Sequence, residues 1–157
     1  MARFLQSMLA EESHMPAPFP HRYEVTLRDE GEGGLLTADP RPPILGGAPR
    51  DFDGSDDWWS PEHLLLSSLS LCLLTTLKAV AAKARLALSA YVSRAEGVLD
   101  KTPAGLAFTS ITLHVGLRVG AADVERAQQL LESAKRHCIV SNSLKPAVTL
   151  QVSVTPA

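Results

Sequence analysis

The sequence predicts an α+β fold in which antiparallel sheets pack on a long buried central helix, in the order βββ-α-ββ-α-β. Three patterns predict it: a long apolar run at residues 60–86, strict alternation of apolar and polar residues at 111–119, and an amphipathic helical pattern at 121–137. Of the 157 residues, 45% are hydrophobic and 20% are charged. This composition is typical of a globular protein with a single core.

Charge and cysteine content narrow the functional classes. The 15 basic and 17 acidic residues give a formal net charge of −2, so we expect neither nucleic acid nor a membrane as a partner. Two cysteines are too few for a disulfide framework, and the first residues lack the basic and apolar regions of a signal peptide. We therefore expect a cytoplasmic protein, in which a cysteine pair suggests redox chemistry or a metal site.

The first third of the chain is predicted to be an arm followed by short strands. Residues 1–20 are expected to form a mobile or exchanged N-terminal arm, because prolines 16, 18 and 20 prevent regular structure, and residues 21–157 are expected to form one domain. Strands at 23–28 and 35–38 form a hairpin around a glycine-rich turn. A short third strand follows, and residues 50–59 form an acidic, aromatic loop before the central helix.

The central helix is predicted from its start signals and its leucines. Ser60 is a suitable N-cap, Pro61 fits the first helical position, and Glu62 lies at the positive end of the helix dipole. Leucines lie on nearly every side of this helix, which indicates a helix surrounded by protein. Serines and threonines interrupt the run and basic residues end it, so it falls short of the roughly 18 apolar residues of a membrane span.

The second half of the chain is predicted to be a hairpin, a helix and a last strand. Residues 88–100 and 106–119 form two long strands, and the alternation in the second is typical of a strand with one buried face. Residues 121–137 form an amphipathic helix. A turn rich in Ser and Asn follows at 139–146, before a final strand at 147–154.

Candidate chemistry is limited to the two cysteines. Cys72 lies midway along the central helix, on a face where Ser68, Leu69 and Thr76 leave room beside the sulfur. The alternative is a plain core cysteine, since free Cys is among the most buried residue types.

Metal and histidine chemistry are not predicted. His137 and Cys138 offer two metal ligands, whereas a closed zinc site needs about four, so we predict no metal. His63 and His114 are expected to be surface or packing histidines, because nothing near either of them in the sequence specifies an acid or base partner.

Two motifs resemble the OsmC/Ohr family of thiol-dependent hydroperoxide reductases. The segment PEHLLLSSLSLC at 61–72 resembles the family's Pro-Glu-Glu-Leu…Cys segment, and HCIVSNSLK at 137–145 resembles its Cys-Pro-Val-Ser-Asn-Leu motif. The resemblance covers roughly residue 22 to the end and includes the element order. The sequence departs from the family pattern at Leu71, at Ile139 and in the enlarged loop at 51–59, which suggests an OsmC-like subgroup.

The resemblance implies roles for particular residues. Cys72 is implied as the thiol that attacks a peroxide and Cys138 as the resolving thiol that then forms a disulfide with it. Arg50 is implied as the cation that lowers the pKa of Cys72, and Glu62 as the acid that holds this arginine. Arg28 and Arg41 are the other arginines ahead of the helix, and they stay open as alternatives.

The resemblance also implies substrates and partners. It implies organic hydroperoxides as substrates, no bound cofactor, and an external dithiol reductant protein of the lipoyl type. A homodimer with its sites at the interface is expected, because a helix that is apolar on all sides needs more cover than one sheet and one helix provide. Trp58 and Trp59 then line the mouth of a substrate pocket that includes Ser68, Leu69 and Thr76, or they are simply interface core.

Two alternatives to peroxide reduction remain open at this point. One is an OsmC-like module that binds a small molecule and keeps vestigial thiols. The other is a thiol redox sensor that reacts with peroxide without turning over.

Overall fold

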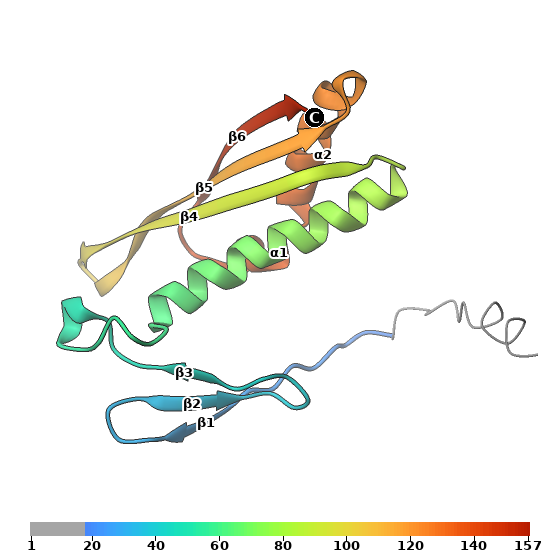
Figure 1. Cartoon of the computed structure of the whole chain (residues 1–157). Coiled ribbons are helices and arrows are strands. Elements are labelled where there is room, and N and C mark those ends of the chain that lie inside the picture. The colour runs from blue at the N-terminus through green and yellow to red at the C-terminus, as the bar shows by residue number, and fades with distance from the viewer. Residues whose placement is uncertain (1–17) are drawn as a thin grey trace, which may run out of the picture. The chain divides into compact units, whose positions relative to one another are not determined.

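The structure is a computed structural model that describes residues 18–157. The predicted arm at 1–20 therefore lies almost entirely outside the described residues. The described chain divides into two compact units, one ending at Leu45 and the other spanning Gly46–Ala157. The α+β class predicted from the sequence is confirmed, with strands and helices in the predicted succession and one additional short helix (Figure 1).

The first sheet has the order β1-β2-β3 and is made of β1 (Thr26–Asp29), β2 (Gly34–Thr37) and β3 (Ile44–Gly46), whose last residue is the first of the second unit. β1 and β2 pair antiparallel around a tight turn in which Gly31 has a φ of 90° and donates its N–H to the Asp29 carboxylate at 2.9 Å. A positive φ favours glycine, so the predicted hairpin turn has a clear local cause. β1 begins three residues later than the predicted strand.

The second unit contains the long helix α1 (Pro61–Lys83), preceded by the short 3-10 turn η1 (Arg50–Phe52). Ser60 caps α1 as predicted, since its Oγ accepts the His63 N–H at 3.2 Å, and Pro61 occupies the first helical position. After α1 come β4 (Leu88–Thr102), β5 (Gly105–Val119), η2 (Ala121–Asp123), α2 (Val124–His137), α3 (Ile139–Ser143) and β6 (Val148–Pro156).

The second sheet has the order β4-β5-β6 and is mixed. β4 and β5 pair antiparallel as a hairpin, whereas β5 and β6 pair parallel. The expectation of purely antiparallel sheets is wrong for this last pair. The reason is the connection: α2 and α3 return the chain to the starting end of β5, so that β6 runs in the same direction as β5.

The core lies between one face of this sheet and the helices α1 and α2. β5 buries alternate residues, from Ile111 to Val119, while α1 buries Leu69, Leu73 and Leu77 at helical spacing. α2 contributes Ala127, Leu131 and Ala134, and Cys138 is part of the same cluster. The sheet therefore has one face on the core, as its alternation predicts.

Two local predictions are corrected by the structure. Residues 139–143, predicted as a turn, form α3, because Cys138 provides an N-cap and the Ser141 N–H has the Cys138 sulfur as its acceptor. α1 is not enclosed on all sides in this single chain, since its buried residues lie on one stripe and Leu71 is 62% exposed. Leu64, Leu65, Leu66 and Leu74 on the same helix are half-buried.

Within residues 18–157, α1 is one helix that is long and apolar enough to cross a membrane by length and composition. The core helix of a soluble protein meets the same criterion, so this is weak evidence. The expectation that this run falls short of a membrane span is therefore wrong by length and composition. Packing of α1 against α2 and β4 is the stronger argument for a core helix.

Candidate functional site

Cys72 lies about three turns into α1, at the edge of its buried stripe. It is half-buried, is a free thiol, and packs against the core cluster. The Thr75 hydroxyl donates to the Cys72 carbonyl at 3.1 Å, and this bond holds the Thr75 side chain against the backbone of α1. Because the start of α1 is so far away, the helix dipole has little effect on the Cys72 sulfur.

Cys138 lies at the junction between α2 and α3 and is 1% exposed. Its sulfur accepts the Ser141 N–H at 3.5 Å, and the Asn142 amide donates to the Arg136 carbonyl at 3.0 Å across the same junction. These two contacts fix the corner in which Cys138 is held. The Ser-Asn segment that the sequence marks as a turn is thus the support of the second thiol.

The structure brings the two thiols together, although they are far apart in the sequence. The pKa of Cys138 is raised from its ordinary value of 9.0 to about 11; burial is the largest cause, the Ser141 N–H opposes the shift, and the neighbouring Cys72 thiol adds to it. Cys138 is therefore a protonated thiol at neutral pH. A half-buried thiol beside a fully buried, protonated one has the asymmetry of an attacking and a resolving cysteine.

Tyr91 is a neighbour of this pair that sequence reasoning missed. It projects from β4 toward the core, and desolvation raises the pKa of its phenol, nearby Ser93 lowers it, and the charge of Cys138 raises it. The Tyr91 oxygen is buried and forms no hydrogen bond of ordinary geometry with any described residue. In the sequence, the only signal for Tyr91 is the alternation of β4, which predicts that its side chain faces the core.

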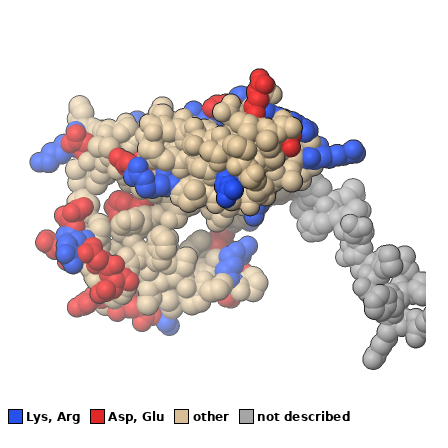
Figure 2. Space-filling view, turned by 45° about the horizontal axis from the view of Figure 1, so that its top comes forward, with Lys and Arg blue, Asp and Glu red and all other residues tan. Residues whose placement is uncertain are grey.

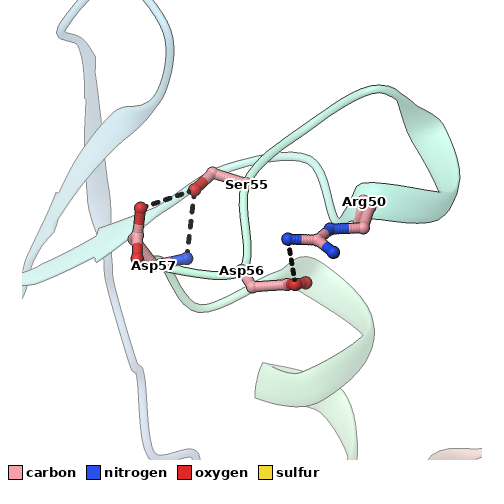
Figure 3. A network of polar contacts seen from close by, with 4 residues as sticks. All are labelled: Arg50, Ser55, Asp56 and Asp57. Carbon is pink, nitrogen blue, oxygen red and sulfur yellow. Dashed lines mark hydrogen bonds and ion pairs between the residues drawn. The ribbon is translucent and has the colours of Figure 1, made fainter.

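Arg50 lies in η1 and pairs with Asp56 at 2.8 Å, with side chains 78% and 64% exposed (Figure 3). In the same loop the Ser55 hydroxyl donates to Asp57 at 3.0 Å and accepts the Asp57 N–H at 3.1 Å. Among the described residues, no ion pair joins Arg50 to Glu62. The single chain thus holds Arg50 within its own loop, and its role toward Cys72 stays a prediction.

Glu62 is half-buried in the first turn of α1. Its Oε2 atom is buried and has no hydrogen-bond partner among the described residues. A buried carboxylate oxygen is costly unless a cation or donor reaches it. Within the described residues, the Glu62 carboxylate therefore lacks the donor that its buried oxygen requires, which is consistent with a missing cationic partner.

The two alternative arginines belong to the first unit. Arg28 pairs with Glu30 at 2.6 Å, and Arg41 approaches the Ala38 and Asp39 carbonyls at 3.4 Å each. Both side chains therefore have local partners, as Arg50 does. The contacts do not discriminate between the three candidates.

The predicted pocket residues are placed on different surfaces. Leu69 is fully buried in the core and cannot line an open pocket, Ser68 is exposed with its hydroxyl on the Leu65 carbonyl at 2.7 Å, and Thr76 is half-buried. Trp58 is half-buried and Trp59 is 52% exposed. Trp59 is anchored by its carbonyl, which accepts the Gly47 N–H at 3.0 Å.

A groove of about 420 Å³ lies between α1 and β4. Cys72 does not line it, and neither do the predicted pocket residues; its polar wall includes His63, Ser67, Ser70, Tyr91 and Ser93. Its apolar wall includes the exposed Leu71. The sequence did not indicate this groove, because it depends on how side chains of α1 and of the following strand β4 pack against each other.

The two histidines set aside in the sequence have local structural contacts. The His63 Nδ1 lies 2.8 Å from the Ser60 hydroxyl at the start of α1, and the His114 Nε2 lies 3.6 Å from the Glu96 carboxylate on the sheet. Within residues 18–157, no group of three or more His, Cys, Asp or Glu side chains is arranged to hold a metal ion.

Comparisons with known proteins give the family. The family model described as "OsmC-like protein" matches residues 54–153. The Escherichia coli protein named peroxiredoxin OsmC is 29% identical over 119 residues, which cover 76% of this chain and 79% of that protein.

Solved structures share the fold. An OsmC-like protein of unknown function from Vibrio cholerae has a TM-score of 0.78 at 17% identity, covering 85% of this chain and all of that one. An organic hydroperoxide resistance protein from Elizabethkingia anophelis has a TM-score of 0.71 at 21% identity, covering 90% of this chain and all of that one. The family match spans more than half of the sequence and includes both cysteines. The chain belongs to the OsmC-like protein family.

Proposed function

We propose that this protein reduces organic hydroperoxides through Cys72 and Cys138. The observation that carries the proposal is the proximity of a half-buried thiol on α1 to a buried, protonated thiol at the α2–α3 junction. Membership of the OsmC-like family supports peroxiredoxin-like chemistry, because a sequence relative is named as a peroxiredoxin and a structural neighbour is named for hydroperoxide resistance.

The reaction balances with these two thiols and an external dithiol. The Cys72 thiolate attacks the outer oxygen of the hydroperoxide, the O–O bond breaks, and the alkoxide takes a proton and leaves as an alcohol. Cys72 is then a sulfenic acid. The Cys138 sulfur attacks it, a disulfide forms, and water leaves; an external dithiol of lipoyl type reduces the disulfide and is itself oxidised.

The roles of Arg50 and Glu62 belong to the same proposal. The positive end of the α1 dipole is too far from Cys72 to stabilise its thiolate, so Arg50 supplies the positive charge. Glu62 holds the Arg50 guanidinium in place. The buried, unpaired Oε2 of Glu62 supports a cationic partner that the single chain does not supply. Trp58 and Trp59 provide apolar surface for the organic part of the substrate.

A homodimer completes the proposal. Leu71 on α1 is 62% exposed, and in the first unit Tyr23, Val25 and Leu27 are 90%, 62% and 66% exposed at alternate positions. Such apolar surface is expected to be covered in solution, and a second copy of the chain is the proposed cover.

We propose a cytoplasmic protein with no resident cofactor, no nucleic-acid partner and no membrane partner. On the face drawn in Figure 2, the Lys and Arg side chains are scattered and do not form one basic patch.

One experiment separates the proposed function from its alternatives. The reduced protein is mixed with one equivalent of cumene hydroperoxide, and its thiols are counted before and after addition of dihydrolipoamide. Loss of both thiols, a Cys72–Cys138 disulfide in peptide mass spectra, and repeated turnover with the dithiol are expected. Unreacted thiols contradict the proposal and favour a binding module, and one reaction without turnover favours a sensor.

A further inference from the structure

The outward face of the second sheet carries a feature that the thiol chemistry does not use. Helices α1 and α2 pack on the other face, so the outward residues of β4, β5 and β6 are uncovered by any helix of this unit (Figure 1). The strand register aligns these outward residues in three cross-strand rows: Arg94-His114-Gln151, Val92-Gly116-Ser153 and Ala90-Arg118-Thr155.

The middle row forms a hollow because Gly116 has no side chain. Cavities of about 430 Å³ and 190 Å³ lie on this face, and both are lined by Val92, Gly116 and Ser153, so they are parts of one continuous depression. We name it the Gly116 hollow. A Cβ at position 116 would lie 3.0 Å from a Val92 methyl carbon, so any larger side chain there fills the space. It is an open depression on the sheet, and the volume of its larger part lies within the range of small-molecule sites.

The charges around the hollow are mainly positive. Arg94 and His114 lie in the row on one side of Gly116, and Arg118 lies in the row on the other side. The Glu96 carboxylate is shared between Arg94 at 2.8 Å and His114 at 3.6 Å, whereas Arg118 has no acidic partner among the described residues. The two guanidinium groups start from rows about 13 Å apart along the strands.

We propose that the Gly116 hollow binds an aliphatic dicarboxylate. One carboxylate pairs with Arg94 and His114, the chain lies over Gly116 against the 69%-exposed Val92, and the second carboxylate pairs with Arg118. Guanidinium groups bind carboxylates through two parallel hydrogen bonds, which suits an anionic group at each end. The site is on the sheet face opposite α1 and Cys138, so the proposal is independent of peroxide reduction.

The test is a titration of the ¹⁵N-labelled full chain with azelate, followed through the Gly116 amide. Arg94→Gln and Arg118→Gln are each expected to weaken azelate binding about tenfold, the effect of losing about 1.4 kcal/mol. Glu96→Gln is expected to tighten it, because Arg94 and His114 lose a competing carboxylate. Gly116→Val is expected to abolish binding with every charge retained, and circular dichroism checks that each variant is folded.

A matched control is available in the first unit. Arg28→Gln breaks an ion pair with the acidic residue two positions later, as Arg94→Gln does, and is expected to leave azelate binding unchanged. Octanoate, with one carboxylate, is expected to bind the wild-type chain about tenfold more weakly than azelate. Equal azelate affinity in the wild-type, Arg94→Gln and Arg118→Gln chains overturns the proposal, and so does inorganic phosphate binding as tightly as azelate.

Discussion

The Ser141 backbone N–H donates to the Cys138 sulfur across 3.5 Å, at the first turn of α3. This contact favours the thiolate form, but burial outweighs it and raises the pKa of Cys138 to about 11. The Ser141 N–H therefore holds the Cys138 sulfur in place, and it would also stabilise the Cys138 thiolate if one formed. It stays neutral until a reaction with Cys72 consumes it.

This pKa predicts a pH dependence of stability. The unfolded chain loses the Cys138 proton near the ordinary value of 9.0, while the folded chain keeps it up to about 11. The stabilisation is thus fully present below pH 9 and is lost between about pH 9 and 11, with a slope of at most about 1.4 kcal/mol per pH unit. Urea unfolding across this range should show a decline that Cys138→Ser reduces. An identical decline in both chains contradicts the burial of a neutral thiol.

Tyr91→Phe is expected to be neutral or to stabilise the protein by up to about 1 kcal/mol, because the buried phenol oxygen has no hydrogen bond of ordinary geometry within residues 18–157. The measurement is the free energy of unfolding in urea, with Ser93→Ala as the comparison for the neighbouring hydroxyl. A loss of stability above about 1 kcal/mol means that the Tyr91 oxygen has a partner that the single chain does not supply.

Arg85 ends α1 with a φ of 54°, a left-handed conformation that favours glycine. The N–H groups of Arg85 and Leu86 donate to the Ala82 and Ala81 carbonyls at 3.0 and 2.9 Å, so the turn itself is well bonded. Arg85→Gly is expected to stabilise the protein by about 0.5–1 kcal/mol, measured by thermal unfolding. Arg85→Ala keeps the strained Cβ and is the control; equal stabilisation by both substitutions contradicts the backbone explanation.

Arg50→Met is expected to slow the first reaction of Cys72 with peroxide about tenfold or more, without unfolding the chain, because the thiolate loses a neighbouring cation. The measurement is the pH profile of Cys72 alkylation in a Cys138→Ser background. Arg28→Met and Arg41→Met are the matched comparisons, because each removes one arginine that has a local partner. A profile that shifts for either of them and not for Arg50→Met transfers the role.

Periodicity predicted most of the fold, for physical reasons that the structure makes plain. Start signals at Ser60 and Pro61 depend on local backbone chemistry, so the start of α1 was found to the residue. Alternation in β5 reports which side chains face the core, and those positions are buried. Alternation carries no information on strand direction, however, so the parallel pairing of β6 was not predictable from it.

The site was less predictable than the fold. The contact of Cys72 with Cys138 followed from the family resemblance and not from spacing, since nothing local in the sequence links residues on α1 and at the end of α2. The ion pair of Arg50 with Asp56 depends on how one loop folds back on itself. Tyr91 was missed because an inward-facing strand residue is ordinarily core, and only its unpaired oxygen distinguishes it.

The division of labour between the two thiols is tested most directly by trapping the product of the first reaction with peroxide. In Cys138→Ser, one equivalent of cumene hydroperoxide followed by dimedone should label Cys72 as a sulfenic acid, because the attacking thiol remains and no resolving thiol is present. In Cys72→Ser, the buried and protonated Cys138 should react little. Dimedone labelling of Cys138 in Cys72→Ser, with none of Cys72 in Cys138→Ser, would contradict the account.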